Sequence, residues 1–175
     1  GRTKSRDFIF IAAYQTLSTE YRYAPASEPT AEFRVILPRE PDHEYSVDHF
    51  EDHFYLLTND GAPNFRLVRA PLSDASRSAW VEVVPHRDDV LLEGFDIFRD
   101  HLVLEEREKG LVRLRVMPWS GDGEHYIEFD DPAWMAFTTS NLEFDTPTLR
   151  FMYTSMTTPA CAWRSGTVSS SGGAR

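Results

Sequence analysis

Hairpin-like segments recur along this chain at a nearly constant interval. DFIFIAAYQTLSTEYRYAP begins at Asp7, DHFYLLTNDGAPNFRLVRAP at Asp52, DHLVLEEREKGLVRLRVMP at Asp100 and TLRFMYTSMTTP at Thr148. Superimposing these segments gives spacings of 45, 48 and 48 residues. A period of about 40–50 residues is typical of propeller blades and related repeats. The repeat therefore restricts the fold more than any other feature of the chain does.

The segment from Asp52 shows why each unit is expected to be a hairpin. Two apolar runs flank Asn59-Asp60-Gly61, which are residues that tolerate a positive φ, and Pro71 ends the second run because it cannot donate to a central ladder. We interpret the hairpin as one building block of a repeated sheet.

Further strand-like segments occur between the hairpins and also repeat. A third member follows each hairpin and closes on proline: Phe33–Pro38, Trp80–Pro85 and Tyr126–Pro132. A fourth leads into the next hairpin: Glu44–Phe50, Val90–Phe98 and Trp134–Phe144. No capped segment with a sustained helical period accompanies them, so the sequence predicts an all-β chain of four-stranded antiparallel blades.

The repeat count predicts only part of a propeller. The first unit begins at its second strand and the last stops after roughly two, whereas propellers close with about four to eight blades. We expect residues 1–159 to form a partial β-propeller of about three to four blades, cut at both ends. We expect residues 160–175 to form an irregular Ser/Gly-rich tail.

Charge and cysteine content exclude several classes of function. The net charge is −10 and no Lys/Arg cluster interrupts it, so nucleic acid and anionic membranes are predicted not to be partners. The apolar stretch at Phe8–Tyr14 is far too short to span a membrane. A single cysteine, Cys161, cannot form an internal disulfide and has no base positioned beside it. We expect a cytoplasmic protein without a cofactor.

Two groups of polar residues resemble chemical sites but are better explained by the repeat. His49, Glu51 and His53 would share one face of a strand, as metal ligands can. In the next repeat, 48 residues later, Ile97 and Arg99 stand at the positions of His49 and Glu51. We therefore interpret the segment as a strand, a turn and the start of the next strand, and we predict no metal site.

Two carboxylate pairs could be imagined as acid and base. They are Glu105-Glu106 and Asp130-Asp131. Adjacent residues on a strand point to opposite faces, so we expect neither pair to converge on one substrate. A propeller glycosidase, which needs inward carboxylates from several blades, remains the weakest of the alternatives.

Five longer phrases stand out: TLSTEYRY (Thr16–Tyr23), LTNDGAPNFRL (Leu57–Leu67), VVPHR (Val83–Arg87), GFDIFRDHLVLEEREKGLVRLRV (Gly94–Val116) and NLEFDTPTLRFMYTSMTTP (Asn141–Pro159). These phrases resemble the propeller domain of the oligopeptidase B group, within the prolyl oligopeptidase family of serine peptidases. The likeness runs from about Lys4 to Pro159. After Pro159 the family pattern ends, and we interpret the remaining residues as out-of-frame or added sequence.

The resemblance implies a seven-bladed propeller joined to an α/β-hydrolase domain that carries Ser, Asp and His. Such enzymes cut short peptides after Arg or Lys, and the propeller admits small substrates while excluding folded proteins. The catalytic domain of a parent enzyme and short basic peptides are the implied partners. Ser170, before Gly172-Gly173, is the nearest match to a nucleophile elbow, but Val168 stands where the first glycine belongs. We identify no catalytic residue and expect the chain alone to be inactive.

Four residues are candidates for substrate gating or interdomain contact. Arg150 and Tyr153 belong to the segment that leads toward the hydrolase domain in the family. Arg66 and Arg87, like Arg113, sit near strand ends, where ion pairs between blades are the commoner use of arginine. A different class remains open, namely a stand-alone interaction module that closes its ring by self-association through exposed blade edges.

Overall fold

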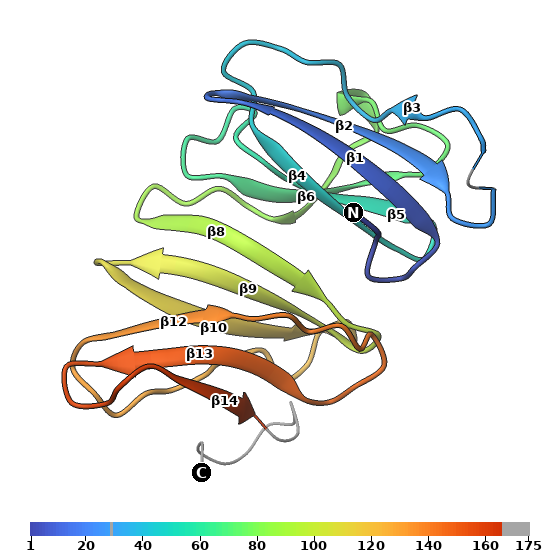
Figure 1. Ribbon diagram of the computed structural model, residues 1–175. Coiled ribbons are helices and arrows are strands. Elements are labelled where there is room, and N and C mark those ends of the chain that lie inside the picture. The colour runs from blue at the N-terminus through green and yellow to red at the C-terminus, as the bar shows by residue number, and fades with distance from the viewer. Residues whose placement is uncertain (29, 166–175) are drawn as a thin grey trace. The chain divides into compact units, whose positions relative to one another are not determined.

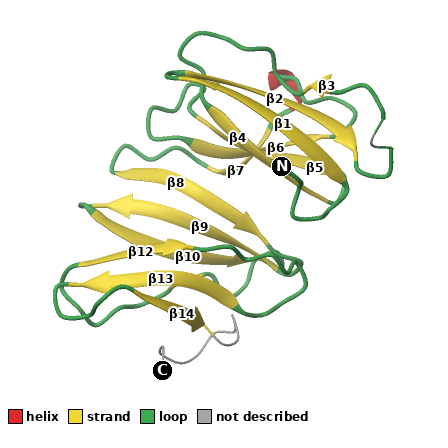
Figure 2. Ribbon diagram, viewed as in Figure 1, coloured by secondary structure: helices red, strands yellow, loops and turns green. Residues whose placement is uncertain are grey.

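The computed structural model describes residues 1–28 and 30–165, and these form four antiparallel sheets (Figures 1 and 2). The only helical turn in the described ranges is the short 3-10 element η1 (Arg77–Ala79). The all-β fold class is thus confirmed. The chain divides into two compact units, Gly1–Asp88 and Asp89–Arg175, and each unit contains two sheets.

The first unit holds a three-stranded and a four-stranded sheet. The strand order of the first sheet is β1-β2-β3, with bounds Phe8–Gln15, Ser18–Pro25 and Arg34–Val35. The order of the second is β4-β5-β6-β7, with bounds Tyr45–Phe50, His53–Thr58, Arg66–Pro71 and Val81–Val84.

The second unit holds the same two kinds of sheet in the reverse order. The four-stranded sheet consists of β8 (Val90–Ile97), β9 (His101–Glu108), β10 (Leu111–Pro118) and β11 (His125–Tyr126). The three-stranded sheet consists of β12 (Trp134–Thr138), β13 (Leu149–Ser155) and β14 (Cys161–Ser165). The described residues thus form two four-stranded sheets, preceded and followed by a three-stranded sheet.

Aromatic and aliphatic side chains fill the space between the two sheets of each unit. In the first unit Phe54 is fully buried, and Phe10 and Tyr21 pack edge to face at 5.9 Å between ring centroids. In the second unit the core joins Val103 and Leu114 of one sheet to Phe151 of the next. A single sheet of this size cannot bury enough apolar surface alone, so face-to-face packing of neighbouring sheets is what makes each unit stable.

The segment that begins at Asp52 is the central hairpin of a sheet, as predicted. β5 pairs with β6 from His53↔Pro71 to Thr58↔Arg66, and the connecting residues 59–65 contain Gly61 at a φ of 60°. The preceding turn also matches the sequence. β4 ends at Phe50, Glu51 adopts a φ of 52° and β5 begins at His53. The strand, turn and strand start inferred from the repeat is therefore confirmed.

Two details of the predicted sheets are wrong. Of the expected third members, Phe33–Pro38 contains only the two-residue strand β3, and Tyr126–Pro132 contains only the second residue of β11. Residues 161–165 also differ from the irregular tail expected over residues 160–175, of which residues 166–175 lie outside the described part of the chain. β14 pairs with β13 from Tyr153↔Cys161 to Leu149↔Ser165, which gives the last sheet a third strand.

Candidate functional site

Arg66, the first of the predicted gating residues, lies in an ion-pair network of its own sheet. Its guanidinium is 3.6 Å from Asp60 and 3.6 Å from Glu82, and it lies 5.9 Å from the ring centroid of Trp80. Arg77 stands at 5.8 Å from the same ring. Arg66 therefore joins residues of one sheet, and the expectation that such pairs would link neighbouring blades is wrong for it.

Arg87 takes part in a loop contact of the first unit. The side-chain amide of Asn64 donates hydrogen bonds to the carbonyl oxygens of Arg87 at 3.1 Å and of Asp88 at 2.9 Å. These bonds hold the chain segment after β7 against the loop between β5 and β6, which is a structural use of the Arg87 backbone.

Arg150 and Tyr153 point to opposite faces of β13. Arg150 lies on the more exposed face, where its guanidinium is 3.6 Å from Glu143. Tyr153 is only 6% exposed and belongs to the core of the second unit. The two residues do not form one site, although the sequence singled them out together.

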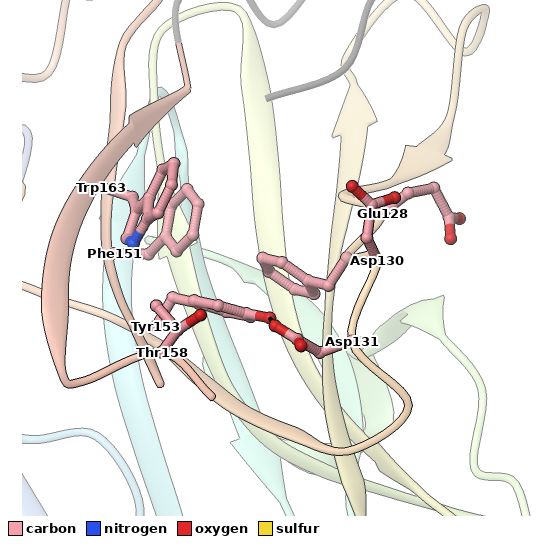
Figure 3. A pocket seen from close by; sticks show the side chains of 8 residues that line it. Glu128, Asp130, Asp131, Phe151, Tyr153, Thr158 and Trp163 are labelled. Atoms are coloured by element: carbon pink, nitrogen blue, oxygen red, sulfur yellow. Dashed lines mark hydrogen bonds between the residues drawn. The ribbon is translucent and has the colours of Figure 1, made fainter. Parts of the chain in front are cut away.

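Tyr153 instead borders a pocket of the second unit (Figure 3). The cavity has a volume of about 160 Å³. Its lining combines four aromatic side chains, three carboxylates and one threonine: Phe129, Phe151, Tyr153, Trp163, Glu128, Asp130, Asp131 and Thr158. Phe129 and Tyr153 stack with centroids 4.7 Å apart, and Tyr153 and Trp163 meet edge to face at 6.0 Å.

Hydrogen bonds fix the acidic side of this pocket. The Tyr153 hydroxyl donates to Asp131 Oδ2, and Thr157 Oγ1 donates to Asp131 Oδ1 at 2.9 Å. The Tyr153 hydrogen bond is the main reason why the pKa of Asp131 is lowered. Asp131 therefore keeps its negative charge beside the aromatic side chains.

The structure corrects the expectation for one carboxylate pair and confirms it for the other. Asp130 and Asp131 lie in the connection between β11 and β12, outside any strand, and both line the pocket. The opposite-face argument therefore does not apply to them. It does apply to β9, where Glu105 accepts a bond from Thr138 N at 2.8 Å while Glu106 pairs with Arg115 at 2.6 Å.

His49, one of the residues considered as metal ligands, and its neighbour Asp48 hold the start of the chain against β4. Ser5 Oγ lies 2.8 Å from His49 Nδ1, and Lys4 N donates to Asp48 Oδ1 at 3.1 Å. Within residues 1–28 and 30–165 there is no group of three His, Cys, Asp or Glu residues placed to hold a metal ion.

Ser5, His49 and Asp7 come together without forming a catalytic triad. Asp7 Oδ2 is 3.6 Å from His49 Nδ1, the same ring nitrogen that Ser5 contacts. A triad needs the serine at one ring nitrogen and the carboxylate at the other. His49 Nε2 is buried without a hydrogen-bond partner in the described structure, and His49 is 2% exposed. No substrate reaches this histidine, so the cluster is structural.

Cys161 is the other nucleophile candidate that lies within the described residues. Cys161 is exposed, and its Sγ contacts the carbonyl oxygen of Pro159 at 3.1 Å. Ser170 lies outside the described residues. No helix in the described part of the chain is long and apolar enough to cross a membrane.

The sequence did not indicate the aromatic pocket. Phe129 lies in a connection for which the sequence predicts a strand, and Trp163 lies in β14, for which it predicts an irregular tail. The signal that could have revealed it is the local pairing of aromatic and acidic residues in Glu128-Phe129-Asp130-Asp131.

Comparison with known proteins supports the fold and the resemblance. Dipeptidyl aminopeptidase BI of Pseudoxanthomonas mexicana is 42% identical over 168 residues, which are 95% of this chain and 23% of that protein. Protease 2 of Moraxella lacunata is 32% identical over 160 residues, which are 91% of this chain and 22% of that protein.

The solved structure of oligopeptidase B from Leishmania major superimposes with a TM-score of 0.86 at 25% identity. The match covers 98% of this chain and 26% of that chain. This chain thus spans about a quarter of the length of its relatives. Residues 1–168 match the family described as prolyl oligopeptidase, N-terminal beta-propeller domain. Because that match covers nearly the whole sequence, the chain belongs to the family of prolyl oligopeptidase N-terminal β-propeller domains.

Proposed function

We propose that this chain is the gating and docking part of a cytoplasmic serine peptidase that cleaves short peptides after Arg or Lys. The observation that carries the proposal is the succession of antiparallel sheets in a sequence that matches the propeller family over residues 1–168. Sheets that pack face to face form a stiff wall, which suits a filter that admits flexible peptides and excludes folded proteins. The proposed partners are an α/β-hydrolase catalytic domain and short basic peptides.

The chemistry itself is assigned to the catalytic domain. Hydrolysis by this family's mechanism needs a serine nucleophile, a histidine base held by a carboxylate, and an oxyanion hole. Among the described residues, the serine, histidine and aspartate that meet, at Ser5, His49 and Asp7, have the wrong geometry and are closed to substrate. We therefore infer that this chain alone does not hydrolyse peptides.

A chimera tests the gating role. Residues 1–168 would replace the matched segment of dipeptidyl aminopeptidase BI, which is 42% identical over that length. The chimera is expected to hydrolyse short peptides and to leave a folded protein substrate intact. A chimera that is labelled by an active-site serine probe but degrades the folded protein contradicts gating. A chimera that is labelled by the probe but cleaves no short peptide contradicts the proposal that this chain docks productively onto the catalytic domain.

The identity to dipeptidyl aminopeptidase BI supports a second candidate specificity, the release of dipeptides from a free N-terminus. The two candidates differ in one chemical requirement. An endopeptidase that cuts after Arg or Lys accepts a peptide with a blocked N-terminus and paired arginines before the fluorophore. A dipeptide-releasing enzyme needs the free amino group. Assay of a peptidase that carries this propeller with blocked and unblocked substrates separates them.

A third candidate is an interaction module that associates with copies of itself. It is supported by exposed apolar side chains on β12, where Met135 is 53% exposed and Phe137 is 41% exposed. Exposed apolar surface of this kind favours association in water.

A further inference from the structure

The pocket around Tyr153 combines two features that favour a cation. Aromatic side chains attract cations to the negative faces of their rings. Phe129 and Trp163 are the partly exposed aromatic side chains of this cavity, whereas Phe151 and Tyr153 are nearly buried behind them. Three carboxylates, those of Glu128, Asp130 and Asp131, lie at the same cavity, and none of its eight lining residues is Lys or Arg. We infer that the pocket binds the cationic side chain of a basic peptide, with a guanidinium or ammonium group against the aromatic side chains.

The carboxylates of the pocket differ in how freely they can meet a ligand. Asp131 accepts hydrogen bonds from Tyr153 and Thr157, but a carboxylate has about four acceptor positions, so it can accept further donors. Asp130 is exposed and makes no hydrogen bond or ion pair within the described residues. Glu128 is 84% exposed, with Arg113 4.0 Å away. Asp130 is therefore the carboxylate whose charge is most available to a ligand.

The chemistry of the lining excludes an anion and disfavours a neutral group. An anion would meet the negative charges of Asp130 and Asp131, and none of the eight lining residues is a Lys or Arg that could balance them. A neutral polar group would lose its hydration at the aromatic walls without gaining a charge interaction. The planar guanidinium suits the site best, because it can stack on a ring and donate several hydrogen bonds to carboxylates at its edge.

Titration of the whole 175-residue chain with Nα-acetyl-arginine amide tests this inference, with tryptophan fluorescence as the readout because Trp163 lines the pocket. We expect saturable binding in the millimolar range. Nα-acetyl-citrulline amide has nearly the same shape without the charge, and it should bind at least about fivefold more weakly.

Two pocket variants and one matched control locate the binding. Asp130→Asn removes a charge that has no hydrogen-bond or ion-pair partner among residues 1–28 and 30–165, and Phe129→Leu keeps an apolar side chain but removes an aromatic one. Each is expected to weaken arginine amide binding about threefold to fivefold. Asp122→Asn makes the same charge change in an exposed loop away from the pocket, and it should leave binding unchanged.

Three results would overturn the inference. They are equal binding of the citrulline and arginine amides, the absence of saturable binding by a chain that shows cooperative thermal unfolding, and unchanged binding in both pocket variants. The inference does not rest on the proposed peptidase role, because it concerns this chain alone. Failure of the arginine titration would leave the expected behaviour of the chimera unaltered.

Discussion

His43 makes the stability of the first unit depend on pH. Its Nε2 lies 2.9 Å from Thr58 Oγ1 and its Nδ1 lies 3.2 Å from Arg77 Nη2. Burial, followed by the charge of Arg77, lowers the pKa of His43 below its usual 6.5, although Asp60 and Glu40 oppose this. Burial also lowers the pKa of His49. Both histidines are therefore held neutral in the folded state.

The direction of the pH effect follows from these shifts. The unfolded state binds protons more readily, so this contribution to the free energy of unfolding is fully present above pH 6.5 and is lost as the pH falls through the folded-state pKa values. We expect the urea concentration at the unfolding midpoint to decrease as the pH is lowered from 8 to 5.5. The His43→Gln variant should show a smaller decrease. His125→Gln, at a histidine outside the first unit, serves as the control. An undiminished fall in the His43 variant would contradict this assignment.

Single residues also show what the sequence could and could not reveal about the candidate site. Arg66, Arg150 and Tyr153 lie on strands, as the sequence predicts. The side chains that they contact come from other segments of the chain. Tyr153 meets Asp131 across 22 residues of chain. Alternation along β13 could have placed Arg150 and Tyr153 on opposite faces, but only tertiary packing reveals the pocket beside Tyr153.

At the scale of elements, the turn between β9 and β10 depends on glycine. The two strands pair up to Glu108↔Leu111, so Lys109 and Gly110 form a two-residue loop with φ values of 50° and 86°. Such a loop suits the twist of a hairpin, and glycine reaches a positive φ without steric cost.

Gly110→Ala is therefore expected to destabilise the chain by about 1 kcal/mol. Gly94→Ala is the matched control, because Gly94 lies in a strand and an added Cβ would meet Glu105 at an ordinary contact distance of 3.6 Å. It should change the unfolding free energy by less than about 0.5 kcal/mol. Chemical denaturation of both variants measures the difference, and equal destabilisation would refute the role assigned to the loop.

The elements were predictable wherever a repeated hydrophobic pattern coincided with a paired strand. The hairpins begin and end within a residue or two of the segments that begin at Asp7, Asp52 and Asp100. Prediction was wrong at the sheet edges, where apolar residues do not require continuous pairing. Ile36 and Leu37 are buried beyond the short β3. Ile36 N donates to Tyr21 O at 2.9 Å, and the Tyr45 hydroxyl donates to Leu37 O at 3.0 Å. β14 was missed because its pairing with β13, rather than an alternating pattern, specifies it.

At the scale of the whole molecule, the exposed face of β12 should cause self-association. Replacement of Met135 and Phe137 by lysine removes exposed apolar surface and adds like charges. We expect light scattering to show concentration-dependent association of the wild-type chain and less of it in the double variant. A compact oligomer of defined mass would support the interaction module, whereas a broad distribution would support a propeller part that lacks its neighbours. Unchanged association in the double variant would contradict the assignment of this face.

The most direct test of the account is whether the purified chain has any catalytic serine. The chain would be incubated with an active-site serine probe and with a fluorogenic peptide ending in paired arginines, beside a full-length family enzyme as the positive control. We predict no labelling and no turnover by the chain while the control is active. Ser5 contacts His49, which is buried and inaccessible to a substrate, and no base is positioned beside Cys161 in the described residues. Labelling of the chain together with turnover would contradict the assignment of this polypeptide to gating and docking alone.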